Sequence, residues 1–386
     1  MSTPSPSIAG RLPAHRRLRR ILGRLALAAG GLVAGVALAE IGARLIHPAG
    51  NADLLFNAPD TTPRGLYLVD HELLLVPAPG FSAVSRGLDH RVPLRINSVG
   101  VRGPEPGEKR GERWLAIGDS FTLATQVAEA DTFEQRLAAL LSAPDARVEV
   151  FNAGVDGYST WQATGRYTRL DGTLQADGAL LTFFLGNDLQ DNERFPMLLP
   201  DARRHPEGVP IPRPTTAPWT AWLTRNSYLY AHYRVWNRAR ALRGGRDPFR
   251  QQWRDELSIF TTGGRGRLQG LLPSTRRALQ QLRDRVQRAG DRLMVAVAPP
   301  AFVVDRERVA PTFEVVGLDP ATADLDAPGA AVLSTLSALH IPACDLTPAL
   351  RAGARTDRMY LTYDGHWTPQ GHAVVAEALA TCMERR

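Results

Sequence analysis

The stretch Trp114-Leu115-Ala116-Ile117-Gly118-Asp119-Ser120-Phe121-Thr122 decides the fold of this chain. Its first four residues form a short apolar run, which is typical of a strand buried on both faces of a sheet. Glycine, aspartate and serine follow at once, and these residue types favour a tight turn and the start of a helix. The stretch therefore predicts a buried strand that delivers a serine to the edge of a sheet.

Four further apolar runs follow along the chain, at 148–151, 179–185, 293–298 and 341–346. Between and after them, leucine, alanine and valine recur at three- and four-residue spacing in 132–141, 160–174, 275–289, 330–339 and 370–383. Buried strands that alternate with amphipathic helices predict an α/β fold. We expect three layers, α/β/α, with a parallel, flavodoxin-like sheet in the middle.

Polar clusters stand where the predicted strands end. They comprise Gly118-Asp119-Ser120, the segment 152–157 (NAGVDG), Gly186-Asn187-Asp188 and, beyond the last strand, Asp364-Gly365-His366. The carboxyl ends of parallel strands are where ligands bind in such sheets, so we expect the clusters to meet at one edge. Together they contain a serine, a histidine, an aspartate and amide donors, which is the set that acyl transfer through a serine requires.

In this order the clusters resemble the sequence blocks of the SGNH (GDSL-like) hydrolase superfamily: GDS, N-x-G-x-x-G, GND and a late Asp–His pair. The resemblance covers roughly residues 110–190 and 290–386. Upstream, the segment 95–103 (RINSVGVRG) resembles the lead-in of membrane-anchored members. The form Asp-Gly-His-Trp at 364–367 also resembles the one found in polysaccharide O-acetylation proteins.

The resemblance implies a role for each residue of the site. Ser120 would be the nucleophile, His366 the general base, and Asp364 the group that orients the imidazole. The backbone N–H groups of Ser120 and Gly157 and the side chain of Asn187 would form the oxyanion hole. Many members place two residues between the aspartate and the histidine, whereas this chain places a single glycine there. No cofactor and no metal ion is expected.

Three functions fit these residues. The first is a serine esterase that acts on an O-acyl ester through an acyl-enzyme intermediate. The second is an O-acyltransferase, specifically an acetyltransferase, that modifies an envelope polysaccharide and takes its acyl group from a membrane-bound donor protein. The third is a non-catalytic carbohydrate-binding or assembly protein on the same scaffold. The expected substrate is an ester or an acylated carbohydrate.

The charge of the chain is concentrated at its N-terminus. The 386 residues carry a formal net charge of +7, and six arginines precede residue 25 without any acidic residue among them. Without those six, 40 basic residues balance 39 acidic ones. A neutral body has no broad cationic surface, so nucleic acid is not an expected partner. Only Lys109 is a lysine, which excludes most mechanisms based on a lysine Schiff base.

The arginines precede an uncharged run of fifteen residues, 25–39. A membrane anchor needs about 20 residues, which the segment reaches only if Arg24 snorkels inward and Glu40 and Arg44 lie at the outer interface. One alternative is a cleaved signal peptide, because Ala37-Leu38-Ala39 fits a cleavage site. Another is a Gly/Ala-rich amphipathic helix on a cytosolic protein. The basic side stays in the cytoplasm both for an anchor and for a signal peptide. We therefore expect a single-pass membrane protein with a periplasmic catalytic domain, or a secreted protein after signal cleavage.

We expect four regions along the chain. They are a basic cytoplasmic tail (1–20), a transmembrane anchor or signal segment (21–46), a β-rich lead-in (47–112) and an SGNH hydrolase domain (113–386) with an insertion at about 190–273. The insertion is rich in aromatic residues, namely Trp219, Trp222, Tyr228, Tyr230, Tyr233, Trp236 and Trp253. We expect it to form a small helical cap with these aromatics as its own core. The alternative is that they stack on sugar rings or receive an acyl chain.

Two cysteines, Cys344 and Cys382, are too few for a disulfide framework. They can pair in an oxidising compartment only if their Cα atoms lie within bridging distance. The sequence leaves a disulfide and two separate buried thiols as open alternatives.

Overall fold

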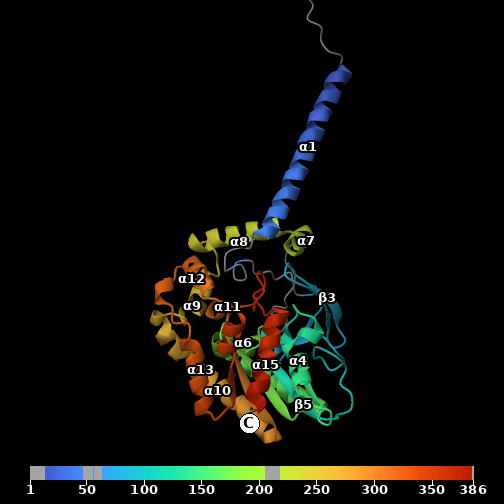
Figure 1. Ribbon diagram of the computed structural model, residues 1–386. Coiled ribbons are helices and arrows are strands. Elements are labelled where there is room, and N and C mark those ends of the chain that lie inside the picture. The colour runs from blue at the N-terminus through green and yellow to red at the C-terminus, as the bar shows by residue number, and fades with distance from the viewer. Residues whose placement is uncertain (1–13, 47–54, 56–62, 205–217, 385–386) are drawn as a thin grey trace, which may run out of the picture.

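The computed structural model describes residues 14–46, 55, 63–204 and 218–384. A sheet with helices on both sides forms the body, and one long helix, α1 (Ala14–Leu45), leaves the body at one end (Figure 1). Residues 1–13 of the expected tail, and 47–62 of the expected lead-in except Leu55, lie outside the described residues.

The central sheet has five strands, all parallel. They are β5 (Glu112–Gly118), β6 (Val148–Asn152), β7 (Gly178–Phe184), β8 (Arg292–Ala298) and β9 (Ala343–Asp345). Their order across the sheet is β6-β5-β7-β8-β9. Counted from the first of the five, this is the order 2-1-3-4-5 of flavodoxin-like folds. The predicted fold class is confirmed, and β5, which precedes Ser120, is an interior strand.

Helices cover both faces of this sheet (Figure 1). The longer ones are α4 (Phe133–Leu141), α5 (Thr160–Leu174), α6 (Asp188–Arg204), α10 (Arg265–Ala289), α13 (Ala327–Ala338) and α15 (Pro369–Glu384). The shorter ones are α3 (Ser120–Leu123), α11 (Ala301–Val304), α12 (Val309–Val316) and α14 (Thr347–Gly353), with single 3-10 turns at Glu129–Asp131, Thr262–Gly264, Arg306–Arg308 and Pro320–Thr322.

Two apolar cores lie on opposite faces of the sheet, because neighbouring side chains of a strand point to opposite sides. From β5, Leu115 and Ile117 enter a core that includes residues of α5, α10 and α13. The alternate residues Trp114 and Ala116 enter a second core with α4, α14 and α15. All four side chains are buried. The apolar run 114–117 therefore contributes alternate side chains to the two cores.

Helix α10 begins earlier than the sequence predicts. The spacing of apolar residues predicted a helix over 275–289, which begins just after Pro273, a residue type that interrupts the hydrogen bonds of a helix interior. In the structure α10 starts at Arg265 and contains Pro273. Leu268 and Leu271, in the turns before the proline, are fully buried in the first core. Tertiary packing of these leucines outweighs the local cost of the proline.

Two antiparallel hairpins form the described part of the lead-in. They pair β1 (Tyr67–Asp70) with β2 (Leu74–Pro77) and β3 (Ser82–Arg86) with β4 (Arg91–Arg95). Asp70 ties the first hairpin to α5, where Arg169 Nη1 donates to its Oδ2 at 2.6 Å. Burial would raise the pKa of Asp70, but the hydrogen bonds from Arg169 and from backbone N–H groups lower it to about 2.

The insertion contains three further helices, α7 (Pro218–Asn226), α8 (Tyr228–Arg243) and α9 (Arg250–Ser258). The expectation that its aromatics form the core of a cap is wrong for four of them. Trp219, Trp222, Tyr233 and Trp236 are all more than half exposed. Trp253, in contrast, packs against the first core. The described helices of the insertion rest on the body, and α7 and α8 turn aromatic side chains outward.

A disulfide joins Cys344 on the edge strand β9 to Cys382 near the end of α15, with 6.0 Å between the Cα atoms. The structure thus selects one of the two alternatives that the sequence left open. The bond links the last strand of the sheet to the last helix of the chain.

Replacing both cysteines by serine should lower the free energy of unfolding by about 2–4 kcal/mol, because the bond closes a loop of 38 residues in the unfolded chain. Thermal unfolding of the full chain in detergent, with and without a reductant, measures this loss. The reductant should lower the midpoint of the native protein and leave that of the double variant unchanged. An equal shift in both proteins would contradict the prediction.

Candidate active site

Ser120 lies at the carboxyl end of β5, where the chain turns directly into α3. Gly118 forms this turn with a φ of +149°, and a Cβ added to it would lie 2.5 Å from Oγ1 of Thr122. A side chain at this position would therefore collide with its surroundings. Asp119 caps α3, since its carboxylate accepts the N–H of Phe121 at 2.9 Å. The turn holds the Ser120 hydroxyl at the edge of the sheet.

The structure brings the three residues proposed for acyl transfer together. Nε2 of His366 lies 2.7 Å from Oγ of Ser120, and Nδ1 of His366 lies 2.5 Å from Oδ1 of Asp364. An ionised carboxylate can only accept, so Nδ1 carries the ring proton and Nε2 is free to accept from the hydroxyl. The side chains of His366 and Asp364 are 20% and 14% exposed, so the hydrogen-bonded row lies just beneath the surface.

A glycine and a carboxylate shape the loop that carries the histidine. Gly365 adopts a φ of +83° between the aspartate and the histidine. From the turn between β3 and β4, Oδ2 of Asp89 accepts the N–H groups of Tyr363 at 2.5 Å and of Asp364 at 3.1 Å. Nε2 of Gln126 donates to the second oxygen of Asp364 at 3.3 Å. The lead-in thus takes part in positioning the site.

Asp89 and Gln126 were not predicted from the sequence. Asp89 lies in a Gly-Leu-Asp-His segment, where an aspartate is expected simply as a turn former. Gln126 follows α3 in a loop and belongs to none of the four clusters. Neither has a sequence spacing to Asp364 that would reveal the contact.

The electrostatic environment of His366 favours its protonated form. Burial alone would lower the pKa of this imidazole, but the negative charge of Asp364 and the hydrogen bond to it raise the pKa above its ordinary value. The charges of Asp119 and Asp156 act in the same direction. For Asp364 burial would raise the pKa, and His366 reverses the shift and lowers it. The Asp364 carboxylate therefore orients the imidazole of His366 and stabilises the positive charge that the ring gains when Nε2 accepts a proton.

Aromatic packing fixes the plane of the imidazole. The ring of Phe121 lies 4.7 Å from that of His366 and 4.9 Å from that of Trp367, measured between centroids. On another side, Phe121 stacks on Phe184 at 4.0 Å. Trp367 is fully buried. These contacts leave the imidazole little room to rotate away from the serine.

The second sequence cluster packs against the turn that holds the serine. Asn152, at the end of β6, donates through Nδ2 to the carbonyl of Thr122 at 2.5 Å and accepts the N–H of Gly154 at 3.2 Å. A Cβ added to Gly154 would lie 2.4 Å from the backbone nitrogen of Leu123. The asparagine and the first glycine of the N-x-G-x-x-G block thus hold α3 from the side.

The structure gives the three expected oxyanion donors different surroundings. Ser120 is the first residue of α3, and Gly157 lies in an exposed turn with a φ of +70°. Within the described part of the chain, no protein acceptor takes the N–H of either residue. Nδ2 of Asn187 donates to Oδ2 of Asp191 at 2.6 Å. One amide hydrogen of Asn187 is engaged in this way, and the second is left for another acceptor.

Two carboxyl groups lie buried behind Ser120. Burial raises the pKa of Asp119 to about 7, although the N–H of Phe121 acts against the shift. Burial also raises the pKa of Asp188 well above its usual range, and the charge of Asp119 adds to the effect. Oδ2 of Asp188 accepts the N–H of Phe184 at 2.9 Å. Both groups accept backbone N–H bonds and hold the ends of strands β5 and β7 in place.

His372 lies near the site but has a structural role. Its Nδ1 accepts the N–H of Phe133 at 3.1 Å, and the side chain is buried. Burial lowers its pKa well below the ordinary value, so it is neutral. Among residues 14–46, 55, 63–204 and 218–384, no group of three or more histidine, cysteine, aspartate or glutamate side chains is placed to hold a metal ion.

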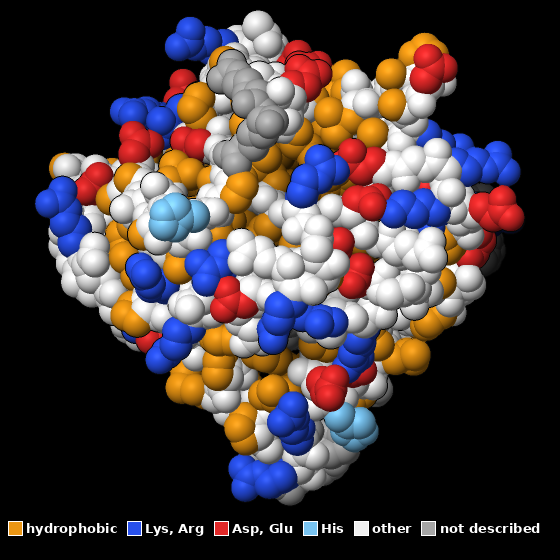
Figure 2. Space-filling view, turned by 90° about the horizontal axis from the view of Figure 1, so that it is seen from below, with side chains coloured by type: hydrophobic (Ala, Val, Ile, Leu, Met, Phe, Trp, Pro, Cys, Tyr) orange, Lys and Arg blue, Asp and Glu red, His pale blue; other side chains and the backbone are white. Residues whose placement is uncertain are grey.

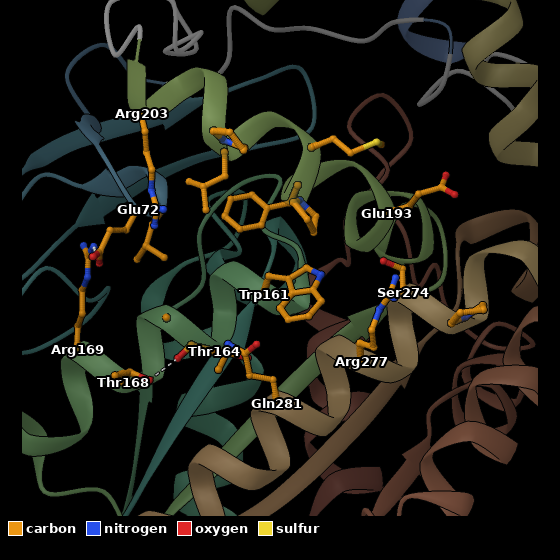
Figure 3. Close-up of a pocket in the computed structure, with 18 of the residues that line it drawn as sticks. Glu72, Trp161, Thr164, Thr168, Arg169, Glu193, Arg203, Ser274, Arg277 and Gln281 are labelled. Carbon is orange, nitrogen blue, oxygen red and sulfur yellow. Dashed lines mark hydrogen bonds and ion pairs between the residues drawn. The ribbon is translucent and has the colours of Figure 1, made fainter.

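A groove of about 1030 Å³ lies elsewhere, between α5, α6 and α10 (Figure 3). The indole of Trp161 points into it, and its Nε1 donates to the carbonyl of Asn192 at 3.0 Å. Ser120, Asp364 and His366 do not line this groove. The serine and histidine therefore face a different part of the surface.

Several solved structures are similar to this chain. An α/β hydrolase named LAE5, from the metagenome of Lake Arreo, has a TM-score of 0.39 and 13% identity over 71% of this chain and 95% of its own. TesA gives 0.38 and 9% over 71% and 99%. A catalytic mutant of Axe2, an acetylxylan esterase from Geobacillus stearothermophilus, gives 0.38 and 12% over 71% and 94%. No curated protein matches the chain.

One protein family matches part of the chain. Residues 260–386, which include Asp364 and His366, match the family described as "SGNH hydrolase-like domain, acetyltransferase AlgX". Ser120 and the other early clusters precede the matched residues, and the geometry above joins the two parts. The match bears out the resemblance to the SGNH superfamily and to proteins of O-acetylation for the part of the chain that carries Asp364 and His366.

Proposed function

We propose that this protein is a serine enzyme that acts on an O-acyl ester outside the cytoplasmic membrane. The observation that carries the proposal is the row of hydrogen bonds from Ser120 to His366 to Asp364, at 2.7 and 2.5 Å. A serine hydroxyl is a weak nucleophile unless a base accepts its proton, and a base works best when a third group orients it. The serine, the base and the orienting group lie together at one edge of the sheet.

The reaction proceeds in two halves. Nε2 of His366 accepts the proton of the Ser120 hydroxyl while Oγ attacks the ester carbon, and Asp364 stabilises the imidazolium that forms. The tetrahedral intermediate then collapses, and the leaving alkoxide takes the proton from Nε2, which leaves an acyl group on Oγ. An incoming hydroxyl repeats the sequence: its proton passes to His366, its oxygen takes the acyl group, and Oγ recovers the proton.

The negative oxygen of the intermediate needs donors that are already in place. The backbone N–H groups of Ser120 and Gly157 serve this purpose, because no described protein acceptor takes them. The remaining amide hydrogen of Asn187 is the third donor.

Two features support a location outside the cytoplasm. In α1, the stretch Leu18–Leu45 is apolar and long enough to span a membrane. Arginines precede its charge-free part, and basic residues stay on the cytoplasmic side. The disulfide between Cys344 and Cys382 fits an oxidising compartment such as the periplasm. We take residues 21–46 as an uncleaved anchor, 1–20 as its cytoplasmic tail, 47–112 as the lead-in, and 113–386 as the catalytic domain with its insertion.

Acetyl transfer to an envelope polysaccharide is the second candidate. The match of residues 260–386 to a family described by an acetyltransferase supports it. The chemistry at Ser120 is the same, and only the second acceptor differs: a sugar hydroxyl in place of water. A membrane-bound acyl donor would then be the natural partner of an anchored enzyme.

The first test is covalent labelling. We expect a fluorophosphonate probe to modify the full chain in detergent at Ser120, as located by peptide mass mapping, because the probe requires an activated serine. Labelling should fall at least about 1,000-fold in His366→Ala, which removes the base. Ser159, an ordinary helix N-cap, provides the control: Ser159→Ala should label normally. A folded protein that stays unlabelled would favour the non-catalytic binding protein.

The pH dependence of the same labelling reaction tests the base. His366 must be neutral to accept a proton, so the rate should fall as the pH drops through its pKa, and this point should lie above 6.5 because Asp364 raises the pKa. In Asp364→Asn the stabilising charge is lost, so the midpoint should move to lower pH while the maximal rate decreases. Identical midpoints in the two proteins would rule out this electrostatic coupling.

With p-nitrophenyl acetate as the acyl donor, the release of nitrophenol shows whether water or a sugar hydroxyl accepts the acyl group. For an esterase, nitrophenol release in water alone should be lost in Ser120→Ala and should not respond to added oligosaccharide. For a transferase, the oligosaccharide should accelerate the release and appear with an added acetyl group in the mass spectrum. Acceleration without an acetylated sugar would argue against transfer.

A further inference from the structure

Helices α7 and α8 present aromatic side chains to the outside of the molecule. Trp219 and Trp222 on α7 are 66% and 62% exposed, and Trp236 on α8 is 57% exposed. Large aromatics seldom stay this exposed in a group unless the surface has a partner. Ala221 and Thr224, between and beyond the α7 tryptophans, are buried, so α7 has an inner and an outer side.

Helix α8 has the same two-sided character. Its inner side carries Ala231, Ala239 and Leu242, which are buried. Its outer side carries a row at three- and four-residue spacing, namely Leu229, Tyr233, Trp236, Arg240 and Arg243, all exposed. The guanidinium of Arg240 lies over the ring of Trp236, 5.6 Å from its centroid. Tryptophan, tyrosine and arginine beside an apolar residue are typical of helices that lie in a membrane interface.

Contacts to α1 set the position of α8. Oε1 of Glu40 accepts the N–H of Tyr228 at 3.0 Å, and Oε2 accepts the N–H of Leu229 at 3.1 Å and the hydroxyl of Ser227 at 2.8 Å. Nε2 of His232 lies 3.2 Å from the carbonyl of Ala43. The first two turns of α8 are thereby fastened to the last turns of α1.

The length of α1 places this junction at the membrane surface. A helix rises about 1.5 Å per residue, so the stretch from Arg20 to Glu40 extends about 30 Å, which equals the hydrocarbon thickness of a bilayer. The side chain of Arg24, one turn inside this stretch, reaches back to the cytoplasmic interface. With arginines at the cytoplasmic interface, Glu40 lies at the outer interface. Helix α8 is held at the same level and runs across the direction of α1, and α7, which packs against α8, lies at the same end of the body (Figure 1).

The opposite end of the molecule has a different surface. Seen from below, the face remote from α1 carries acidic and basic side chains dispersed among apolar ones (Figure 2). Mixed charges of this kind suit contact with water. The row of exposed aromatics therefore lies at the end of the body where a membrane that contains α1 would be.

We propose that the outer sides of α7 and α8 form a platform that lies in the headgroup region of the membrane that α1 spans. The partner is the lipid surface, and the contacts are Trp219, Trp222, Leu229, Tyr233 and Trp236, with Arg240 and Arg243 toward anionic headgroups. The inference rests on the proposed role of α1 as an anchor.

Helix α8 also contacts the loop that carries Asp364 and His366. The ring of Tyr228 packs edge-on against that of Tyr363, with 5.8 Å between centroids, and its hydroxyl donates to the carbonyl of Leu88 at 3.2 Å. Asp89, next to Leu88, accepts the backbone N–H groups of Tyr363 and Asp364. Contact with lipid thus fixes the height of the active site above the membrane.

Tryptophan quenching in the full chain tests the platform. Residues 1–46 contain no tryptophan, so quenching by lipid reports on the body of the protein and not on α1. The protein is placed in nanodiscs of phosphatidylcholine and phosphatidylglycerol, with or without a phosphatidylcholine that bears a nitroxide near the headgroup. We expect the nitroxide lipid to reduce the emission of the native protein, and we expect this loss to disappear in the triple variant Trp219→Phe, Trp222→Phe, Trp236→Phe.

The matched control is the double variant Trp161→Phe, Trp253→Phe, whose tryptophans lie away from the outer sides of α7 and α8 and which should keep the quenching. Fluorophosphonate labelling of each sample shows separately that the site is intact. Protein that enters nanodiscs without quenching, or a triple variant that is still quenched, would overturn the platform while leaving the anchor. Failure to enter the nanodiscs would overturn both, whatever the labelling of Ser120.

Discussion

The turn from β5 into α3 is the constraint on which the site depends. Gly118 has no room for a Cβ, Gly154 touches the backbone of the turn, and Asn152 holds the carbonyl of Thr122. Two segments, the end of β5 and the end of β6 with the loop after it, therefore pack tightly around the turn at Ser120. Because protein interiors are packed as densely as crystals, a change in either segment moves the hydroxyl relative to His366.

The strands and most helices of the body could be predicted because their buried residues form continuous apolar runs or recur at three- and four-residue spacing in the sequence. The rule that ligands meet at the carboxyl ends of parallel strands then placed the four polar clusters together, and the geometry of Ser120, Asp364 and His366 agrees with that placement. The start of α10 could not be predicted, because Pro273 is a strong local signal and the burial of Leu268 that overrides it is a tertiary effect.

The parts that sequence analysis missed depend on contacts between distant segments. Gln126 and Asp364 are 238 residues apart, and Asp89 reaches the same loop from a turn in the lead-in. No feature of the local sequence around Asp89 or Gln126 indicates that these residues position Asp364. The exposed aromatics of α7 and α8 were missed for a related reason: composition predicts that tryptophan is buried, and which side of a helix faces outward depends on the tertiary structure.

Helix α8 receives hydrogen-bond acceptors from another helix in addition to its own N-cap, Ser227, whose side chain accepts the N–H of Tyr230. The two oxygens of Glu40 accept the N–H groups of Tyr228 and Leu229, and losing such capping contacts costs a helix on the order of 1 kcal/mol. A fragment cut after residue 47 to obtain soluble protein leaves those donors to water and loosens Tyr228, which packs on the neighbour of Asp364. Helix α1 thus supports the fold of α8 and of the loop beside it, and removing α1 alters the protein that is to be studied.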